Sequence, residues 1–270
     1  MVMQEWTVAS PQTIDIDAPV TELAIRIVAG HVDVVTADDP DGVRVEVTDI
    51  EDAPLLVSVD DGVLTIQHER VTWDGILGWL RLDRKLERRR AVVSVAVPPD
   101  CSAHIGVVSA SAVLAGLSGQ TRVRCVSGDV VLDEVAGEID VESVSGDIEA
   151  RGLNGGLSLR TVSGGLTVVD GRSGQVRAKS VSGDVALDLQ PERSVDIDVT
   201  TVSGDVTVRL PGETGATVDL ASTSGDLACA FDGLNLQKRP GSRRLSGSIG
   251  DGAGALHGRT VSGRVALLAR

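Results

Sequence analysis

The chain has 270 residues, of which 42% are hydrophobic, 24% are charged and 1% are aromatic, and its formal net charge is -14. This length suffices for one large or two small globular domains. The four aromatic residues argue against base-stacking, sugar-stacking and aromatic-cage sites, because such sites need exposed rings. The acidic charge excludes general nucleic-acid binding, since most of the surface would repel a phosphate backbone.

Residues 1–100 are predicted to form an N-terminal β region. Short runs at 23–28, 31–35, 43–47, 55–59 and 63–66 alternate between apolar and polar residues, as strands with one buried face do. Asp60-Asp61-Gly62 is typical of a hairpin turn. We interpret the region as irregular opening coils that cap the body formed by the rest of the chain. A separate sandwich domain is the alternative.

The segment 71–90 breaks this alternation and is predicted to be an insertion. Its apolar residues at 73, 76, 77 and 80 match one face of a helix, and clustered basic residues follow them. Such a segment suits an anionic membrane surface or an acidic partner, or it caps an edge of the fold, and the two roles are compatible. The candidate docking residues are Trp73, Trp79, Arg81, Arg84, Lys85, Arg88, Arg89 and Arg90.

Residues 101–270 contain an internal repeat built on the sequence Val-Ser-Gly-Asp. Its serines are Ser127, Ser145, Ser163, Ser182, Ser203, Ser224 and Ser262, at spacings of 18, 18, 19, 21, 21 and 38 residues. The last spacing is about twice the others and predicts one longer turn or an inserted loop over 238–254. The basic residues of that stretch lie among Gly, Ser and Pro, which is typical of a solvated, mobile insertion.

Each repeat predicts two short strands, one ending at Ser-Gly-Asp and one beginning there. Apolar residues occupy the third and fifth positions after the serine, as Val130 and Leu132 do after Ser127. A unit this small cannot bury its apolar face alone, but stacked units close a continuous core. The predicted fold is therefore all-β, a single-stranded β-helix or solenoid with coils of about 18 to 21 residues. Its narrow aliphatic interior accounts for the scarcity of rings.

The three cysteines are odd in number and far apart, which favours neither a disulfide framework nor a metal-ligand motif. Cys125 occupies a position that Ser or Thr fills in other repeats, so it is expected in an inward hydroxyl row. Cys229 falls at an apolar core position.

The recurring Ser, Gly and Asp residues are interpreted as a structural turn ladder. Glycine supplies the positive φ of a sharp corner, and Ser and Asp side chains bond turn amides. A calcium or catalytic-acid row is the alternative, although Gly165 and Arg264 interrupt it. We therefore predict no metal and no cofactor. The ladder consists of Ser127, Gly128, Asp129, Ser145, Gly146, Asp147, Ser182, Gly183, Asp184, Ser203, Gly204, Asp205, Ser224, Gly225 and Asp226.

Catalysis is not expected. The histidines His31, His68, His104 and His257 are scattered along the chain, and paired carboxylates for glycoside hydrolysis cannot be singled out. No catalytic residue is therefore predicted, and a carbohydrate-active β-helix enzyme is kept as an alternative.

The Ser-Gly-Asp ladder, the entry strand ending Val95-Ala96-Val97-Pro98 and the closing Thr260-Val261-Ser262-Gly263 together resemble a bacterial domain family of unknown function. This family is labelled "putative adhesin" and is also called the toastrack domain. The resemblance covers nearly the whole chain, most specifically residues 92–268. It implies a single-stranded β-helix, no established catalytic residues, and a role as an interaction or assembly module beside membrane proteins of the cell-envelope stress response.

We therefore expect a non-enzymatic interaction or scaffold protein whose charged ladders face a protein partner, which is membrane-associated in one version of this hypothesis. A surface adhesin is the alternative. The sequence has neither a signal-peptide pattern nor a transmembrane run, so we expect a cytoplasmic, membrane-proximal protein with peripheral membrane contact at most. Self-association is expected through an unprotected terminal coil near residues 265–268.

Overall fold

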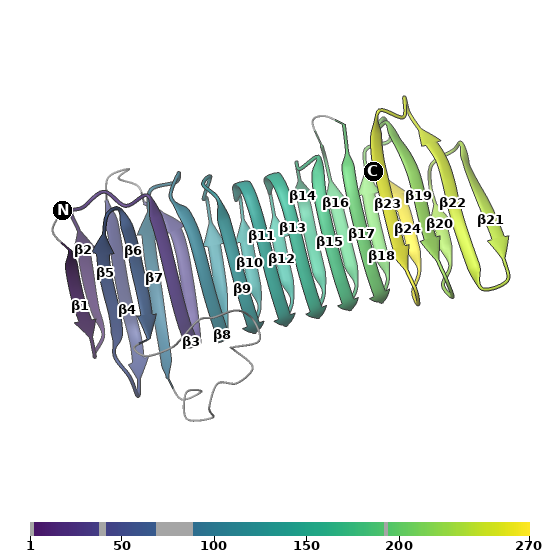
Figure 1. Ribbon diagram of the computed structural model, residues 1–270. Coiled ribbons are helices and arrows are strands. Elements are labelled where there is room, and N and C mark those ends of the chain that lie inside the picture. The colour runs from purple at the N-terminus through teal and green to yellow at the C-terminus, as the bar shows by residue number, and fades with distance from the viewer. Residues whose placement is uncertain (1–2, 38–41, 69–88, 192–193) are drawn as a thin grey trace. The chain divides into compact units, whose positions relative to one another are not determined.

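The computed structural model describes residues 3–37, 42–68, 89–191 and 194–270. Within these ranges the chain forms 24 strands and no helix (Figure 1). The chain falls into two compact units, Met1–Gly137 and Glu138–Arg270. The predicted all-β fold with stacked parallel coils is confirmed in each unit. The boundary between the units lies within the repeats, whereas the predicted division at residue 100 rests on periodicity and stays a prediction.

Parallel coils build the interior of the first unit, and antiparallel strands close one end of it. β8 pairs in parallel with β3 along nearly its whole length and with β9 on its other side. The two halves of β3 also pair in parallel with β6 and β7, whose outer edges pair antiparallel with β5 and β4. β1 and β2 then pair antiparallel with β5 and β4. Its strands are β1 (Gln4–Val8), β2 (Gln12–Ile16), β3 (Glu22–Thr36), β4 (Val43–Glu51), β5 (Leu55–Asp60), β6 (Val63–His68), β7 (Arg90–Val97), β8 (Ser102–Ala115), β9 (Thr121–Ser127) and β10 (Val130–Asp133).

β3 of the N-terminal region stacks in parallel on β8. The role of residues 1–100 as opening coils and cap, with a separate sandwich domain as the alternative, stays a prediction. The apolar residues of β3 and β8 that point inward, such as Ile25, Val32 and Ile105, are almost wholly buried. Because β3 stacks directly on β8, residues before and after position 100 share one core.

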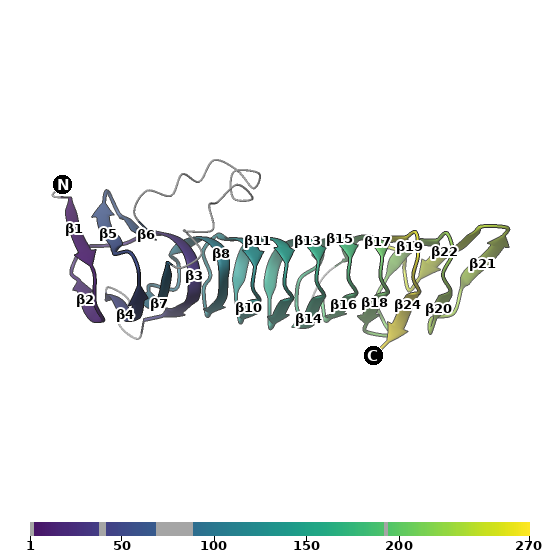
Figure 2. The same ribbon diagram turned by 90° about the horizontal axis from the view of Figure 1, so that it is seen from below.

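The second unit is a solenoid with two walls. β13, β15 and β17 form one wall and β14, β16 and β18 the other, all by parallel pairing (Figure 2). Each coil turns the corner between its two strands at the predicted Ser-Gly-Asp. The strands are β11 (Ala136–Ser145), β12 (Ile148–Arg151), β13 (Asn154–Ser163), β14 (Leu166–Gly171), β15 (Gln175–Ser182), β16 (Val185–Leu189), β17 (Asp196–Ser203), β18 (Val206–Leu210), β19 (Ala216–Ser222), β20 (Leu227–Cys229), β21 (Leu234–Arg239), β22 (Ser242–Ile249), β23 (Gly254–Thr260) and β24 (Val265–Ala269).

The last coils do not stack in the order of the sequence. β23 lies between β17 and β19, and β24 lies between β18 and β20. The segment predicted as a mobile insertion instead forms β21 and β22, which pair antiparallel with each other, while β22 pairs antiparallel with β19. This antiparallel return lets the final repeat lie between two earlier coils, so that Ser262 neighbours Ser203 on one side while the coil of Ser224 lies on the other side.

This order bears on the predicted site of self-association. Val265 to Leu267 pair with β18 on one side and with β20 on the other, and Leu268 pairs with β18. Self-association of the protein stays a prediction.

The corner glycines allow successive coils to approach closely. Gly183 has a φ of 155°, and a Cβ added there would lie 2.0 Å from the carbonyl oxygen of Gly164 on the neighbouring coil. Gly204 stands in the same relation to Gly183, at 2.2 Å. A real Cβ cannot occupy either position, because the obstructing atom is backbone. The repeated glycine is therefore needed for space as well as for its positive φ.

Replacing Gly183 by Ala tests this constraint. We expect Gly183→Ala to lower the free energy of unfolding by about 2 kcal/mol or more, because the corner must open to admit the methyl group. Chemical denaturation of the purified protein measures the change. Gly212→Ala is the matched control, since nothing lies within 4 Å of a Cβ built there. Equal stability of the two variants would contradict the close-approach argument.

A buried histidine completes the core of the first unit. His68 ends β6, is 1% exposed, and its Nδ1 accepts a hydrogen bond from the Val28 backbone N–H at 3.3 Å. Burial, with a smaller contribution from the charge of Arg89, lowers the pKa of His68 to about 4. The folded protein therefore holds this imidazole neutral.

This shift predicts a pH dependence of stability. The unfolded chain takes up a proton at a pKa of about 6.5, whereas the folded chain does not until about 4, so stability is retained above pH 6.5 and falls as the pH drops from 6.5 towards 4. One such proton contributes a slope of at most about 1.4 kcal/mol per pH unit. His68→Gln keeps a hydrogen-bond acceptor and should show a shallower slope in urea denaturation between pH 6.5 and 4.5. Identical slopes in the variant and the wild type would reject His68 as the group responsible.

Candidate functional site

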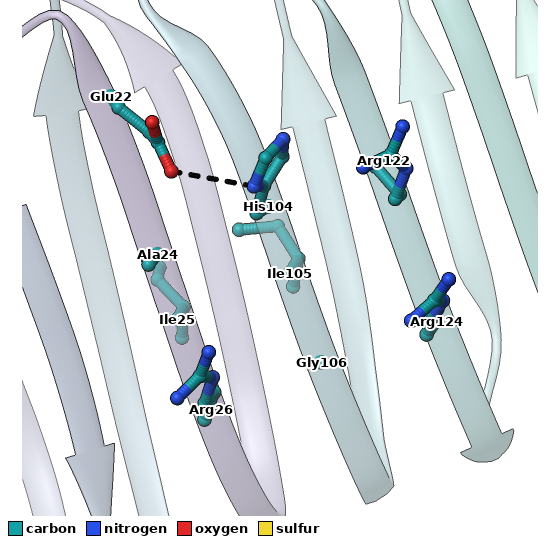
Figure 3. Close-up of a pocket in the computed structure, with 9 residues that line it drawn as sticks. All are labelled: Glu22, Ala24, Ile25, Arg26, His104, Ile105, Gly106, Arg122 and Arg124. Carbon is teal, nitrogen blue, oxygen red and sulfur yellow. Dashed lines mark ion pairs between the residues drawn. The ribbon is translucent and has the colours of Figure 1, made fainter. Parts of the chain in front are cut away.

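A shallow groove with a volume of about 200 Å³ lies on the outer face of β3, β8 and β9 (Figure 3). Three of its nine lining residues are arginines and one is a glutamate, although the chain as a whole is acidic. The lining residues are Glu22, Ala24, Ile25, Arg26, His104, Ile105, Gly106, Arg122 and Arg124.

Strand register explains how these side chains come together. Arg26, Gly106 and Arg124 occupy one row across the three strands. Because side chains alternate between the two faces of a strand, His104 lies on the same outer face as Gly106. Glycine contributes no side chain, so the middle of the Arg26–Arg124 row is open, as Figure 3 shows.

One acidic residue borders the groove. His104 Nδ1 lies 3.4 Å from Glu22 Oε1, and both side chains are about one-third to two-fifths exposed. The other ring nitrogen of His104, Nε2, is buried and has no hydrogen-bond partner among the described residues. This groove can therefore offer several N–H donors to a ligand. Sequence reasoning missed it because its residues come from segments about 80 residues apart.

The predicted docking segment lies largely beyond the part of the chain that the structure describes. Trp73, Trp79, Arg81, Arg84, Lys85 and Arg88 fall outside the described residues. Arg89 and Arg90 are described. The Arg89 carbonyl accepts a hydrogen bond from Ala29 N–H at 3.2 Å, and Arg90 Nε lies 3.7 Å from Asp49 Oδ2. These two residues are thus tied to the sheet of the first unit.

The aspartates of the turn ladder bond from one coil to the next. Asp147 Oδ1 accepts the N–H of Gly165 at 2.7 Å, and Asp184 Oδ1 accepts the N–H of Asp205 at 2.8 Å. Asp205 Oδ1 in turn accepts the N–H of Arg264 at 2.8 Å. Each acceptor needs only a backbone amide at the equivalent position of the neighbouring coil. This explains why Gly165 and Arg264 can interrupt the row of carboxylates.

The serines, Gly225 and Asp226 of the turn ladder also lie at the corners between strands. The serines end their strands and, from Ser163 to Ser203, are exposed. Gly225 would place a Cβ 1.5 Å from the Gly263 carbonyl oxygen, and Asp226 pairs with Arg243 of β22. No group of three or more potential metal ligands occurs among the described residues.

The inward hydroxyl row contains Cys125, as expected. Cys125 is 2% exposed, and its Sγ lies 3.2 Å from the Gly128 carbonyl oxygen. At the equivalent positions the hydroxyls of Ser143, Thr161 and Ser180 are buried and have no hydrogen-bond partner among the described residues. Ser222 and Thr260 of the same row donate hydrogen bonds to backbone carbonyls at 3.0 and 3.3 Å, so the row holds both bonded and unbonded side chains and can accept a thiol.

Cys229 departs from the prediction of a core position, since it is only partly buried. It lies on β20, which pairs with β24 on one side, and among the described strands none pairs with its other edge. Partial burial raises the pKa of the Cys229 thiol.

The structure also places His31 where the ladder has aspartate. His31 Nδ1 lies 2.7 Å from Ser111 Oγ, and Nε2 lies 2.9 Å from Asp33 Oδ1. A serine hydrolase bonds its serine to Nε2 and its carboxylate to Nδ1, so this arrangement is reversed. We interpret it as a corner contact between adjacent coils, which share the register His31↔Ser111.

Exposed valines form a line along one corner of the second unit. Val162, Val181, Val202 and Val261 precede the corner serines and are 46%, 47%, 48% and 49% exposed. We call these four residues the valine ridge. The residue before each ridge valine points inward, so alternation requires the valine to point outward. This alternation can be read from the sequence, but it was not applied there to the valine before each corner serine.

A basic row runs beside the valine ridge. Arg160, Lys179 and Arg259 lie two residues before Val162, Val181 and Val261, and Thr200 holds the fourth position of the row. Arg160 pairs with Glu142 at 2.7 Å, whereas among the described residues neither Lys179 nor Arg259 has an ion pair within 4.0 Å. The corner thus combines aliphatic surface with positive charge.

The inter-coil carboxylate bond predicts a specific mutational pattern. Asp205→Ala should lower the free energy of unfolding by about 1 kcal/mol, because the Arg264 N–H loses its acceptor. Asp205→Asn should retain most of the stability, since its amide oxygen can accept the same bond. Thermal and urea denaturation distinguish the two. A loss as large in Asp205→Asn as in Asp205→Ala would show that charge, and not the hydrogen bond, is what matters there.

Three solved structures match this chain over most of its length, and the TM-score of one of them exceeds 0.5. A protein of Parabacteroides distasonis named as a "putative lipid binding protein" has a TM-score of 0.53 and 13% identity, over 96% of this chain and 97% of that one. A "putative adhesin" of Bacteroides fragilis gives 0.48 and 11%, over 96% and 98%. A "putative cell adhesion protein" of Clostridium sporogenes gives 0.30 and 9%, over 97% and 100%. At these identities the likeness concerns the fold alone.

No curated protein matches the chain. The model of the Toastrack DUF4097 family matches residues 118–196 and 169–268, which together span more than half of the chain and contain the corner glycines and the valine ridge. The protein therefore belongs to the Toastrack DUF4097 family.

Proposed function

We propose that this protein is a non-enzymatic interaction module that docks a protein partner on the valine ridge and the adjoining basic row. The observation that carries the proposal is the alignment of four half-exposed valines on stacked coils. Single exposed aliphatic residues are common and need no explanation, but a contiguous line of them exposes apolar surface that a partner can cover. Coils about 4.8 Å apart make this line continuous.

Charge complementarity indicates the chemistry of the partner. Lys179 and Arg259 stand beside the ridge without ion pairs among the described residues, so an acidic partner segment can bond them while its aliphatic side chains cover the valines. The second unit carries 17 acidic and 14 basic residues and is therefore close to neutral, so it does not repel such a segment strongly. An extended segment fits best, because the ridge and the basic row run in parallel.

We also propose a reducing, cytoplasmic location for this module. Among the described residues none of the three cysteines forms a disulfide, and Cys101 and Cys125 are buried. Burial raises the pKa of the Cys101 thiol to about 11, which disfavours the reactive thiolate. No helix of the described residues is long and apolar enough to span a membrane.

Introducing negative charge at the centre of the valine ridge tests the proposal. The double variant Val181→Glu/Val202→Glu places carboxylates beside Lys179 and should weaken partner binding at least about tenfold, which corresponds to 1.4 kcal/mol. Partners are captured from native cells with membranes retained, and their affinity for each variant is then measured with purified components. Both positions are nearly half exposed, so the fold should tolerate the change.

Val169→Glu is the matched control, because Val169 is 41% exposed but lies on β14, away from the ridge. A photo-crosslinking side chain at position 181 should also capture the partner, and one at position 169 should not. Undiminished binding by the ridge variant, or crosslinking from position 169 alone, would contradict docking at the ridge.

A further inference from the structure

We propose that the groove of the first unit is a binding site for the phosphate group of a small soluble ligand, held over Gly106 between Arg26 and Arg124. This inference is independent of the valine ridge, because it concerns different strands and a different ligand. It rests on the register of β3, β8 and β9, on the space left by the missing side chain of Gly106, and on the N–H donors of the neighbouring arginines.

The first step is geometric. Arg26, Gly106 and Arg124 are aligned on three neighbouring strands, so the two arginine Cα atoms are about 10 Å apart at a strand spacing of about 4.8 Å. Any larger residue at position 106 would project between them. With glycine there, a group of phosphate size can rest on the sheet with a guanidinium on either side, which is the opening seen in Figure 3.

The second step concerns hydrogen-bond donors. A guanidinium has five N–H donors in a planar fork that matches the oxygens of phosphate. An arginine can therefore keep a contact with a neighbouring side chain and still present donors to an anion. His104 lies two residues before Gly106 on the same face, and its buried Nε2 has no partner among the described residues. His104 Nδ1 faces Glu22 Oε1 at 3.4 Å, so the donors available over Gly106 are those of the arginines.

The third step is electrostatic and limits the size of the ligand. Three arginines and one histidine line the groove with one glutamate, whereas residues 1–137 as a whole carry 22 acidic and 11 basic residues. Their net charge of 11 − 22 = −11 disfavours a long polyanion or an anionic bilayer, which would extend beyond the groove. A compact ligand with one phosphate group contacts only the groove, whose lining contains three arginines and a single glutamate. The chemistry therefore favours a phosphorylated small molecule over a nucleic acid or a membrane.

Titration with inorganic phosphate at constant ionic strength tests the site. Calorimetry on the full chain should show saturable binding with one site per chain. The double variant Arg26→Gln/Arg124→Gln should weaken it at least about tenfold. Gly106→Thr should do the same without any change of charge, because its side chain fills the space between the arginines.

Arg44→Gln is the matched control. Arg44 is also a basic residue of the first unit, but it is ion-paired with Asp15 at 2.6 Å and lies outside the groove. Its phosphate affinity should equal that of the wild type, and circular dichroism should show that all variants are folded. Absence of saturable binding by the wild type, or an equal loss in Arg44→Gln, would overturn the proposal. So would binding to vesicles containing phosphatidic acid with no binding of free phosphate.

Discussion

The structure depends on the close approach of backbone at its corners. Where a Cβ would lie within about 2 Å of the neighbouring carbonyl oxygen, as at Gly183 and Gly204, only glycine fits. This approach fixes the coil spacing, and the coil spacing fixes the register of every strand that leaves the corner. The Asp184 and Asp205 carboxylates then bond amides of the next coil, which locks the same register from the outside. Packing of the aliphatic interior follows from this alignment.

Side chains on the outer surface are aligned by the same register. Since equivalent positions stack coil on coil, any residue type that recurs in the repeat becomes a continuous row. Recurrence of valine before the corner serine therefore produces a ridge and not scattered exposed side chains. The groove of the first unit has the converse origin, because a row is interrupted where Gly106 lacks a side chain. Both candidate surfaces thus arise from stacked equivalent positions. In the ridge the same residue type recurs from coil to coil, and in the groove one position of a row lacks a side chain.

The repeat allowed the fold of the coils to be predicted from sequence, and the ends could not be predicted in the same way. The spacing of serines located the corners, and alternation located the inward faces, because both signals are local. Stacking order is not local: Ser262 neighbours Ser203 only because β22 returns antiparallel to β19. The groove was hidden for the same reason, as Arg26 and Arg124 are joined by register and not by sequence. The outward valines, by contrast, could have been found by applying alternation at Val162.

In both units antiparallel strands pair with the edge of a parallel coil. A parallel coil leaves an unpaired edge, and such an edge is prone to pair with other chains. In the first unit β4 and β5 turn antiparallel to cover β7 and β6, and in the second β22 and β21 do so beyond β19. The outermost strand β21 then carries Lys238 and Arg239, followed by Pro240, and both charge and proline disfavour further strand pairing. These strands cover the edges of β6, β7 and β19, whereas one edge of β20 has no paired strand among the described residues. The ridge and the groove both lie on the sides of the coils.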